Sequence, residues 1–326
     1  MNVLALQGGG CHGYGQALIL SELERRAGRP VFELFGMVGG TSVGSINGAV
    51  LSIGVPATRL ETFYTKDAPL IFSTSWINDA ESFRRPKYKA DSLEAGLMQL
   101  LGNKTLADCK TIFIATSYDF ATDRPVYFLS HEKSSESKNF IVIGNDSPME
   151  LWQICRASSA AQTYFPAYQC GGMTLMDGGN AGDNAPDMLL ATEAVRLGKS
   201  FRMLSLGSGD SKWSVEADDM VNPSKIRAGL ETIEIVFSAG ESAAIFKAGR
   251  LIGSGYYRLS PDLGDGLAID DALGVLEKMP MAVKILLDAN GATLDEFCDL
   301  AAAAASQKPC AQGAGNGTAA APEIEP

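Results

Sequence analysis

The same unit, an apolar run followed by a glycine-rich turn and a helical pattern, occurs twice in the first 55 residues. Residues 3–6 lead into the glycines at 8–10, and residues 32–38 lead into the glycines at 39–40. Apolar runs this short are typical of parallel strands that are buried on both faces of a sheet. Strands that alternate with helices need crossover connections, so the pattern predicts a three-layer α/β sandwich with a mostly parallel central sheet.

Composition divides the chain into three expected parts. The strand–helix alternation continues to about residue 210, so residues 1–210 are expected to form one α/β domain whose motif-bearing core spans 3–190. Residues 211–300 are expected to form a mainly helical extension packed on the same domain. Residues 301–326 are rich in Ala, Gly and Pro, which predicts a disordered tail.

The net charge of the chain limits the partners that it can bind. With 27 basic and 38 acidic residues the formal charge is −11, which argues against a nucleic acid polymer as partner, because phosphate binding needs a basic surface. An acidic bulk charge also opposes attraction to anionic membranes. The basic run at 84–89 could contact phosphate head groups or a nucleotide, although such runs are more often solvated loops.

The N-terminus and the cysteines indicate the compartment. Residues 1–6 lack the basic stretch of an export signal, and no apolar run reaches the roughly 18 residues of a spanning helix. The six cysteines are scattered, without the close pairs of a metal site, and are expected to be free thiols in a reducing compartment. We therefore expect a cytoplasmic protein without metal or cofactor, whose contact with a membrane is peripheral.

The first glycine motif leaves three interpretations open. Gly8, Gly10 and Gly13 have the spacing of a dinucleotide-binding turn between a strand and a helix. The backbone N–H groups of such a turn can bind a diphosphate, or they can bind the oxyanion of a tetrahedral intermediate. A tight turn without a ligand is the third interpretation. His12 lies inside the motif and would neighbour either kind of site.

The second glycine motif favours a nucleophile. The segment Gly40-Thr41-Ser42-Val43-Gly44 follows the pattern G-x-S-x-G, and it lies where an expected strand ends and a helix begins. The sharp turn needs glycines two residues before and after the serine, and the helix N-terminus favours a developing alkoxide. Ser42 is therefore the candidate nucleophile, with a chance Gly-Ser loop as the alternative.

A nucleophilic serine needs a base, and the chain contains only two histidines. His131 lies in a polar stretch that indicates a solvated loop, and His12 belongs to the glycine turn. A carboxylate is the remaining choice. Asp177 follows a short apolar run and precedes Gly178-Gly179, which predicts a position at the carboxyl end of the sheet, where ligands bind in α/β folds. Asp-Gly is also a common turn pair, so Asp177 is either a base or an ordinary turn residue.

Taken in order, these motifs resemble those of the patatin-like phospholipases. The family pattern is D-G-G-G-x-R-G, then G-T-S-x-G, then D-G-G or D-G-A. The chain has QGGGCHG at 7–13, GTSVG at 40–44 and DGG at 177–179. The segment RASSAAQTYFP at 156–166 is similar to a further family segment, and the resemblance covers about residues 3–210.

The resemblance implies the role of each matched residue. Ser42 corresponds to the nucleophile of a Ser–Asp dyad, Asp177 to its base, and Gly8, Gly9 and Gly10 to the loop whose amides form the oxyanion hole. The implied activity is hydrolysis of fatty acyl esters in membrane phospholipids or related lipids, of the phospholipase A type. Some bacterial members are anti-phage effectors activated by cyclic oligonucleotides, so a nucleotide activator is a further expectation.

Three departures from the family pattern surround the expected site. Gln7 replaces the usual aspartate, and His12 replaces the usual arginine or lysine, so an always-charged group becomes one that titrates near neutral pH. After the DGG, the segment 183–186 carries an extra residue. We expect the strength of oxyanion stabilisation and the loop that follows Asp177 to differ from the family pattern.

Two competing functions lack the hydrolase activity. The first is a nucleotide-binding protein that uses the glycine turn, and the second is a protein that only binds lipid. A dinucleotide site would need an acidic residue at the end of the second strand, where the chain has Met37-Val38.

Overall fold

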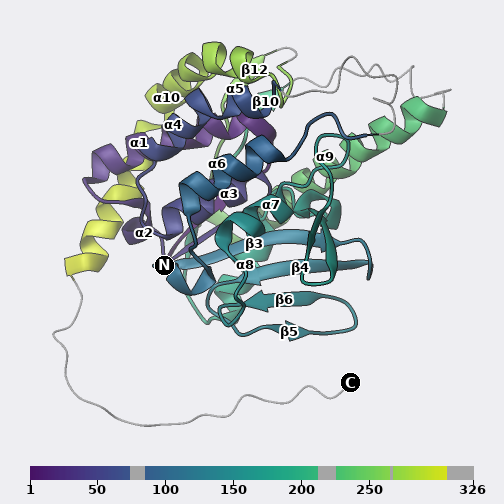
Figure 1. Cartoon of the computed structure of the whole chain (residues 1–326). Coiled ribbons are helices and arrows are strands. Elements are labelled where there is room, and N and C mark those ends of the chain that lie inside the picture. Colours follow the sequence, from purple (N-terminus) through teal and green to yellow (C-terminus); the bar gives the residue numbers. More distant parts are fainter. Residues whose placement is uncertain (74–84, 212–224, 265–266, 307–326) are drawn as a thin grey trace, which may run out of the picture.

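The computed structural model describes residues 1–73, 85–211, 225–264 and 267–306 (Figure 1). These residues form the α/β sandwich that the strand–helix alternation predicts. Of the expected tail, residues 301–306 continue a helix, and 307–326 lie outside the described residues. Arg84 of the basic run also lies outside them. The boundaries of the three expected parts stay a prediction.

Most of the strands belong to one sheet of ten. They are β1 (Asn2–Leu6), β2 (Met37–Gly40), β3 (Ile112–Asp119), β4 (Arg124–Leu129), β5 (Ser135–Glu136), β6 (Ile141–Gly144), β7 (Tyr168–Cys170), β8 (Met173–Asp177), β9 (Arg202–Leu206) and β11 (Tyr256–Leu259). The centre is parallel throughout, in the order β11-β9-β1-β2-β3. Beyond β3 the sheet is mixed, because β4 runs antiparallel to β3. The mostly parallel central sheet is thus confirmed.

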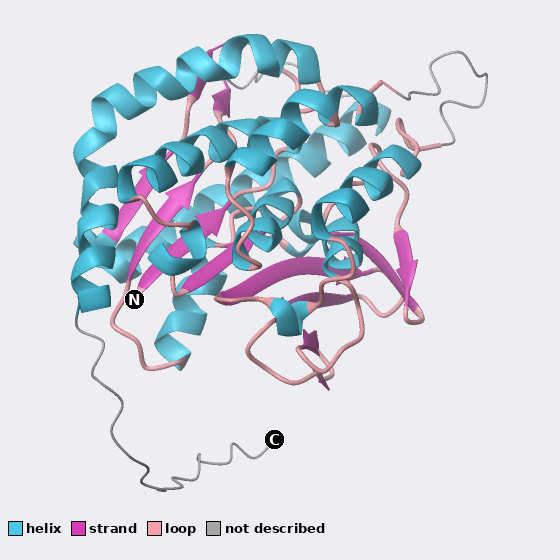
Figure 2. Cartoon of the chain, turned by 60° about the vertical axis from the view of Figure 1, so that its left-hand side comes forward, coloured by secondary structure: helices cyan, strands magenta, loops and turns pink. Residues whose placement is uncertain are grey.

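Helices cover both faces of this sheet, and Figure 2 shows the strands passing beneath a thick helical layer. That layer contains α1 (Gly13–Ala27), α3 (Val43–Ser52), α4 (Thr58–Lys66), α5 (Ala68–Ile71), α6 (Asp91–Leu101), α7 (Leu151–Ser158) and α10 (Ala272–Ser306). The other face is covered by α8 (Asp187–Arg196), on which α9 (Lys225–Ile252) packs.

The alternation of side chains along β1 explains the two cores. Leu4 and Leu6 point into the thick helical layer, whereas Val3 and Ala5 point to the opposite face and pack with Leu190 of α8. All four β1 side chains are fully buried. Successive strand residues face opposite sides of a sheet, so an uninterrupted apolar run is what a doubly covered strand requires.

The second apolar run is not one strand. Residues 32–38 were expected to be continuous, but α2 (Val31–Leu34) is a helical turn, and β2 begins only at Met37. Pro30 precedes α2 in an extended conformation, and Pro is well tolerated where a helical turn begins because it needs no N–H partner there. Apolar composition alone does not distinguish a buried helical turn from a buried strand.

The region after residue 210 also contributes strands. In this region β11 extends the parallel sheet next to β9, and β12 (Asp262–Gly264) pairs with β10 (Asp210–Ser211). The sequence of β11, Tyr-Tyr-Arg-Leu at 256–259, is short, and the pair of tyrosines is its only strand signal. The edge of the sheet is therefore completed by chain far from its other strands.

The long strand β3 brings two distant segments together end to end. Its first half pairs in parallel with β2, and Ala115 lies opposite Gly40. Its second half pairs antiparallel with β8, and Ser117 lies opposite Asp177. Because β4 occupies the other edge of β3, β2 and β8 share one edge and approach from opposite directions. Their carboxyl ends therefore meet at Thr116, the one residue between the two registers.

The packing of α3 on the end of β1 leads to a test. A Cβ on Gly44 would lie 2.1 Å from the Leu6 carbonyl oxygen, and this backbone cannot move aside easily. We expect Gly44→Ala to lower the free energy of unfolding by about 2 kcal/mol or more, measured by urea denaturation. Gly249→Ala is the matched helical control, since its Cβ would lie 3.5 Å from Tyr256, an ordinary contact. Equal stability of the two variants would contradict this packing.

Candidate active site

Ser42, the predicted nucleophile, lies at the sharp turn between β2 and α3. Its backbone has φ 54° and ψ −126°, a conformation that residues other than glycine rarely adopt and that costs about 1–3 kcal/mol. A Cβ on Gly40 would lie 2.1 Å from the carbonyl group of Gly44, so no side chain fits at Gly40. The Ser42 N–H donates to the Ser158 hydroxyl over 2.9 Å. This local geometry is that of a nucleophile elbow.

Asp177, the predicted base, lies at the end of β8 and is only 2% exposed. Its carboxylate accepts from the Gly179 N–H over 2.8 Å, and the Ser42 side chain lies close enough to act on the pKa of the carboxyl group. Burial raises the pKa of Asp177 to about 6, although the Gly179 N–H and the Ser42 side chain oppose the rise. Near neutral pH the carboxylate is therefore ionised yet able to accept a proton.

The glycine loop lies directly beside Ser42. A Cβ on Gly8 would lie 3.2 Å from the Ser42 Cβ. The Gly8 N–H is already used, because it donates to the Asn184 carbonyl over 3.0 Å. In the described part of the chain no hydrogen-bond partner is seen for the N–H groups of Gly9 and Gly10. Gly10 has φ 56°, which favours glycine, and this turn exposes neighbouring N–H groups.

The remaining motif glycines fit tight spaces. A Cβ on Gly178 would lie 2.0 Å from the Thr116 hydroxyl oxygen, and one on Gly13 would lie 2.3 Å from the Tyr64 hydroxyl oxygen. Gly178 therefore lets the chain after β8 pass directly against β3. Gly13 lets α1 start close to α4, which carries Tyr64.

His12 is buried, with 3% of its surface exposed, and points away from solvent. Its Nε2 atom lies 3.2 Å from the Ala268 carbonyl oxygen, which can only accept, so Nε2 carries the proton. Burial lowers the pKa of His12, against the opposing effects of this hydrogen bond and of Asp271 and Asp270. The imidazole is therefore neutral at neutral pH, unlike the arginine or lysine of the family pattern.

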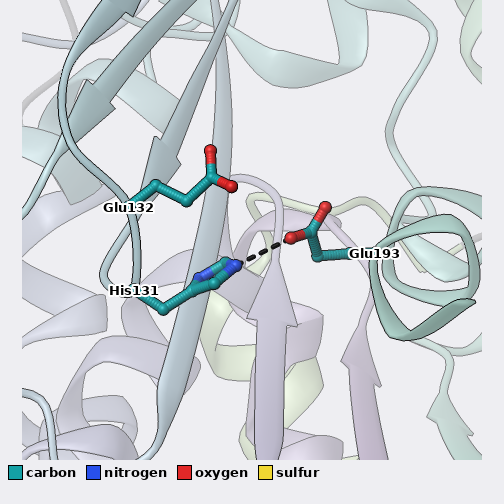
Figure 3. A group of neighbouring side chains, drawn as sticks. All are labelled: His131, Glu132 and Glu193. Carbon is teal, nitrogen blue, oxygen red and sulfur yellow. Dashed lines mark hydrogen bonds and ion pairs between the residues drawn. The ribbon is translucent and has the colours of Figure 1, made fainter. Parts of the chain in front are cut away.

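His131, the alternative base, is engaged elsewhere (Figure 3). Its Nε2 lies 2.7 Å from the Glu193 carboxylate on α8. Glu132 completes a group of possible metal ligands, but the Arg196 guanidinium already contacts both carboxylates. We interpret the group as an ion-pair cluster, since the guanidinium already supplies the cation that these carboxylates would bind.

Several residues around the site carry no local sequence signal. The Thr41 hydroxyl donates to the Asp183 carbonyl and lies 2.8 Å from the Thr116 hydroxyl, so Thr116 donates to Thr41. This pair links the segment after β2 to β3. The Ile269 carbonyl accepts from the Cys11 N–H over 2.7 Å, and so supports the glycine loop from chain more than 250 residues away. Only a contact between distant segments could have identified them.

The burial of His12 leads to a second test. Because its imidazole is neutral, kcat/KM should not fall as pH rises through the ordinary histidine range near 6.5. His12→Gln, which keeps a donor for the Ala268 carbonyl but cannot titrate, should give the same pH profile. His12→Ala should lower the free energy of unfolding by about 1–3 kcal/mol through the orphaned carbonyl and the cavity. An alkaline fall that disappears in His12→Gln would instead indicate a charged imidazole.

The chain is similar to known proteins. The patatin-like phospholipase family model matches residues 4–190, more than half of the chain. A cGAMP-activated phospholipase of Pseudomonas aeruginosa (strain BWHPSA011 / Pa011) is 26% identical over 275 residues, covering 79% of this chain and 77% of that protein. A cGAMP-activated phospholipase of Escherichia coli (strain TW11681) is 29% identical over 212 residues, covering 61% and 57% respectively.

A plant protein shares the same region. Patatin group J-1 of Solanum tuberosum is 27% identical over 246 residues, covering 64% of this chain and 60% of that protein. The family match also contains all three glycine motifs within residues 4–190. The chain therefore belongs to the patatin-like phospholipase family, whose members are lipid acyl hydrolases that act on esters.

Proposed function

We propose that this protein hydrolyses fatty acyl esters of membrane phospholipids, with Ser42 as nucleophile, Asp177 as proton acceptor and the glycine loop as oxyanion hole. The observation that carries the proposal is the approach of Ser42 and Asp177 where β2 and β8 end against β3, close enough for the serine side chain to act on the pKa of the carboxyl group. A serine hydroxyl is a weak nucleophile unless an adjacent base takes its proton. Among the residues that the structure describes, Asp177 is the candidate base that lies next to the Ser42 side chain.

In the first half-reaction, the Ser42 Oγ attacks the ester carbonyl carbon while its proton passes to Asp177. The carbonyl electron pair moves onto oxygen, and the N–H groups of Gly9 and Gly10 stabilise that oxyanion. When the tetrahedral intermediate collapses, the C–O bond to the alcohol breaks, and Asp177 returns the proton to the leaving oxygen. The products are a lysolipid and an acyl-serine.

In the second half-reaction, water attacks the acyl-serine and gives its proton to Asp177. The same oxyanion forms and collapses, the bond to the Ser42 Oγ breaks, and Asp177 protonates that oxygen. The fatty acid leaves and the free serine is restored. One carboxylate thus serves as base and acid in turn, which requires a pKa nearer to neutrality than that of a solvated aspartate.

Access to the lipid and control of the activity are parts of the same proposal. We propose a cytoplasmic enzyme that contacts the membrane peripherally when active. Among the described residues, no helix combines the length and the apolar character needed to cross a bilayer. Two relatives are named as cGAMP-activated phospholipases, which supports a cyclic oligonucleotide as activator of this chain.

The nucleophile is tested with Ser42→Ala on a panel of phospholipids and short-chain esters, each with and without cGAMP. We expect hydrolysis in the wild type, loss of at least a thousandfold in the variant, and unchanged thermal unfolding. A fluorophosphonate probe should label Ser42 alone. Lipid or nucleotide binding without hydrolysis in the wild type would favour the binding-protein alternatives, and labelling at another serine would refute the assignment.

The base is tested through pH. Because ionised Asp177 accepts the proton, kcat/KM of the wild type should rise as pH increases through about 6. Asp177→Asn should lower kcat by several orders of magnitude. His131→Ala is the control, because His131 lies in the ion-pair cluster, and it should retain activity. Comparable losses in the two variants would overturn the dyad.

Asp177→Asn should also change stability, in the opposite direction. The pKa of Asp177 is raised in the folded protein, so ionisation weakens the fold as pH rises from about 4 to about 6. The neutral Asn lacks this cost, and the variant should be more stable than the wild type by about 1–3 kcal/mol at pH 7.5. The difference should vanish below pH 4, where both side chains are neutral.

A further inference from the structure

Gln7, the first departure from the family pattern, has a charged partner from the far end of the chain. Its side-chain oxygen accepts a hydrogen bond from the Arg258 guanidinium on β11, and its amide donates to Ser208 over 3.3 Å. Arg258 is also anchored to the sheet, because its Nη1 donates to the Ser205 hydroxyl over 2.8 Å. A neutral glutamine accepts a hydrogen bond from the guanidinium but does not compensate its positive charge. Arg258 can therefore also attract a carboxylate.

That second partner is Glu241 on α9, whose carboxylate lies 3.7 Å from the same guanidinium nitrogen. The other oxygen of Glu241 accepts from the side-chain amide of Asn184 over 3.2 Å. Asn184 belongs to the segment with the extra residue, another departure from the pattern. Its carbonyl accepts the Gly8 N–H over 3.0 Å, and Gly8 follows Gln7 in the chain.

These contacts close a ring that runs from Gln7 through Arg258, Glu241 and Asn184 to Gly8 and back. The ring holds the start of the glycine loop at two neighbouring residues, through the Gln7 side chain and the Gly8 N–H. Two of its members, Arg258 and Glu241, lie outside the matched family region of residues 4–190. The arginine side chain is 18% exposed and the glutamate 22%, so solvent screens the pair only in part.

We propose that Arg258 and Glu241 are positioning residues for the oxyanion loop, and that the region beyond residue 190 completes the catalytic site in this way. The proposal rests on the function proposed above. Neither residue touches the reacting atoms. Each acts through Gln7 or Asn184, which fix Gly8 against Ser42 and thereby set the direction of the next two N–H groups.

The physical reason is the freedom of a glycine loop. Three successive glycines have the largest backbone entropy of any sequence, so the loop has no conformational preference of its own. An oxyanion hole works only when its donors already point to the place where charge develops, about 2.7–3.1 Å from that oxygen. His12 is neutral and contacts Ala268, whereas Arg258 brings a guanidinium to Gln7 at the start of the loop.

The test measures hydrolysis of a short soluble ester by Arg258→Met in the full-length chain. We expect kcat to fall about 10- to 100-fold while KM changes less than twofold, because the loop acts on the transition state. The apparent pKa of the base, read from the pH profile, should stay at the wild-type value. Arg25→Met is the matched control, since Arg25 is an exposed arginine paired with Glu22 on α1, and it should retain full activity.

Coupling between ring members separates positioning from a general loss of fold. Gln7→Leu and Arg258→Met should each lower kcat, and the double variant should be no worse than the more damaged single one. Arg258→Lys should be intermediate, because one ammonium cannot reproduce the guanidinium contacts with Gln7, Ser205 and Glu241. Glu241→Gln keeps an acceptor for Asn184 and removes only the charge, so it should lose less activity than Arg258→Met.

The outcomes distinguish failure of this proposal from failure of the proposed function. If wild-type hydrolysis is absent or does not depend on Ser42, the proposed function itself is wrong. If hydrolysis depends on Ser42 but Arg258→Met keeps the wild-type kcat, the positioning role is refuted. The positioning role is also refuted if the losses of kcat multiply in the Gln7–Arg258 double variant. The same holds if activity falls in proportion to thermal stability across the variants, which would indicate a structural role.

Discussion

The double pairing of β3 is the constraint on which the candidate site depends. One edge of this strand holds β2 in parallel and β8 antiparallel, so two carboxyl ends that are distant in sequence face each other across Thr116. The turn after β2 carries Ser42, and the last residue of β8 is Asp177. Backbone ladders fix both ends, so the approach of the two side chains does not depend on flexible loops.

Burial raises the pKa of Asp177 and also lowers the stability of the fold when Asp177 is ionised. Asp177 lies in a low-dielectric site with few donors, which raises its pKa to about 6 and makes it a usable base near neutral pH. The same burial destabilises the ionised form, so the reactive state of the site is a weaker point of the fold. Burial lowers the pKa of His12, because it disfavours the charged imidazolium, and the imidazole stays neutral. Burial thus shifts the pKa of both residues toward the neutral form.

The glycine loop is held by segments from three parts of the chain. Asn184 takes the Gly8 N–H, Ile269 takes the Cys11 N–H, and Arg258 binds Gln7. These contacts leave Gly9 and Gly10 as the loop N–H groups without a partner in the described structure. The three departures from the family pattern, at Gln7, His12 and the Asn184 segment, therefore all lie in the contacts that hold this loop, and two of them belong to one ring.

The sequence by itself determined the mostly parallel α/β layout and predicted the G-x-S-x-G elbow, and it favoured a carboxylate over a histidine as the base, because these follow from short-range patterns and from an inventory of residue types. It did not separate α2 from β2, since apolar composition is the same for a buried turn and a buried strand. Only the tertiary structure decided that Asp177 meets Ser42, that His12 is buried and neutral, and that Arg258 and Glu241 reach the glycine loop. Those outcomes depend on contacts between residues up to about 250 positions apart, and such contacts form only when β-strand register and helix packing bring the segments together.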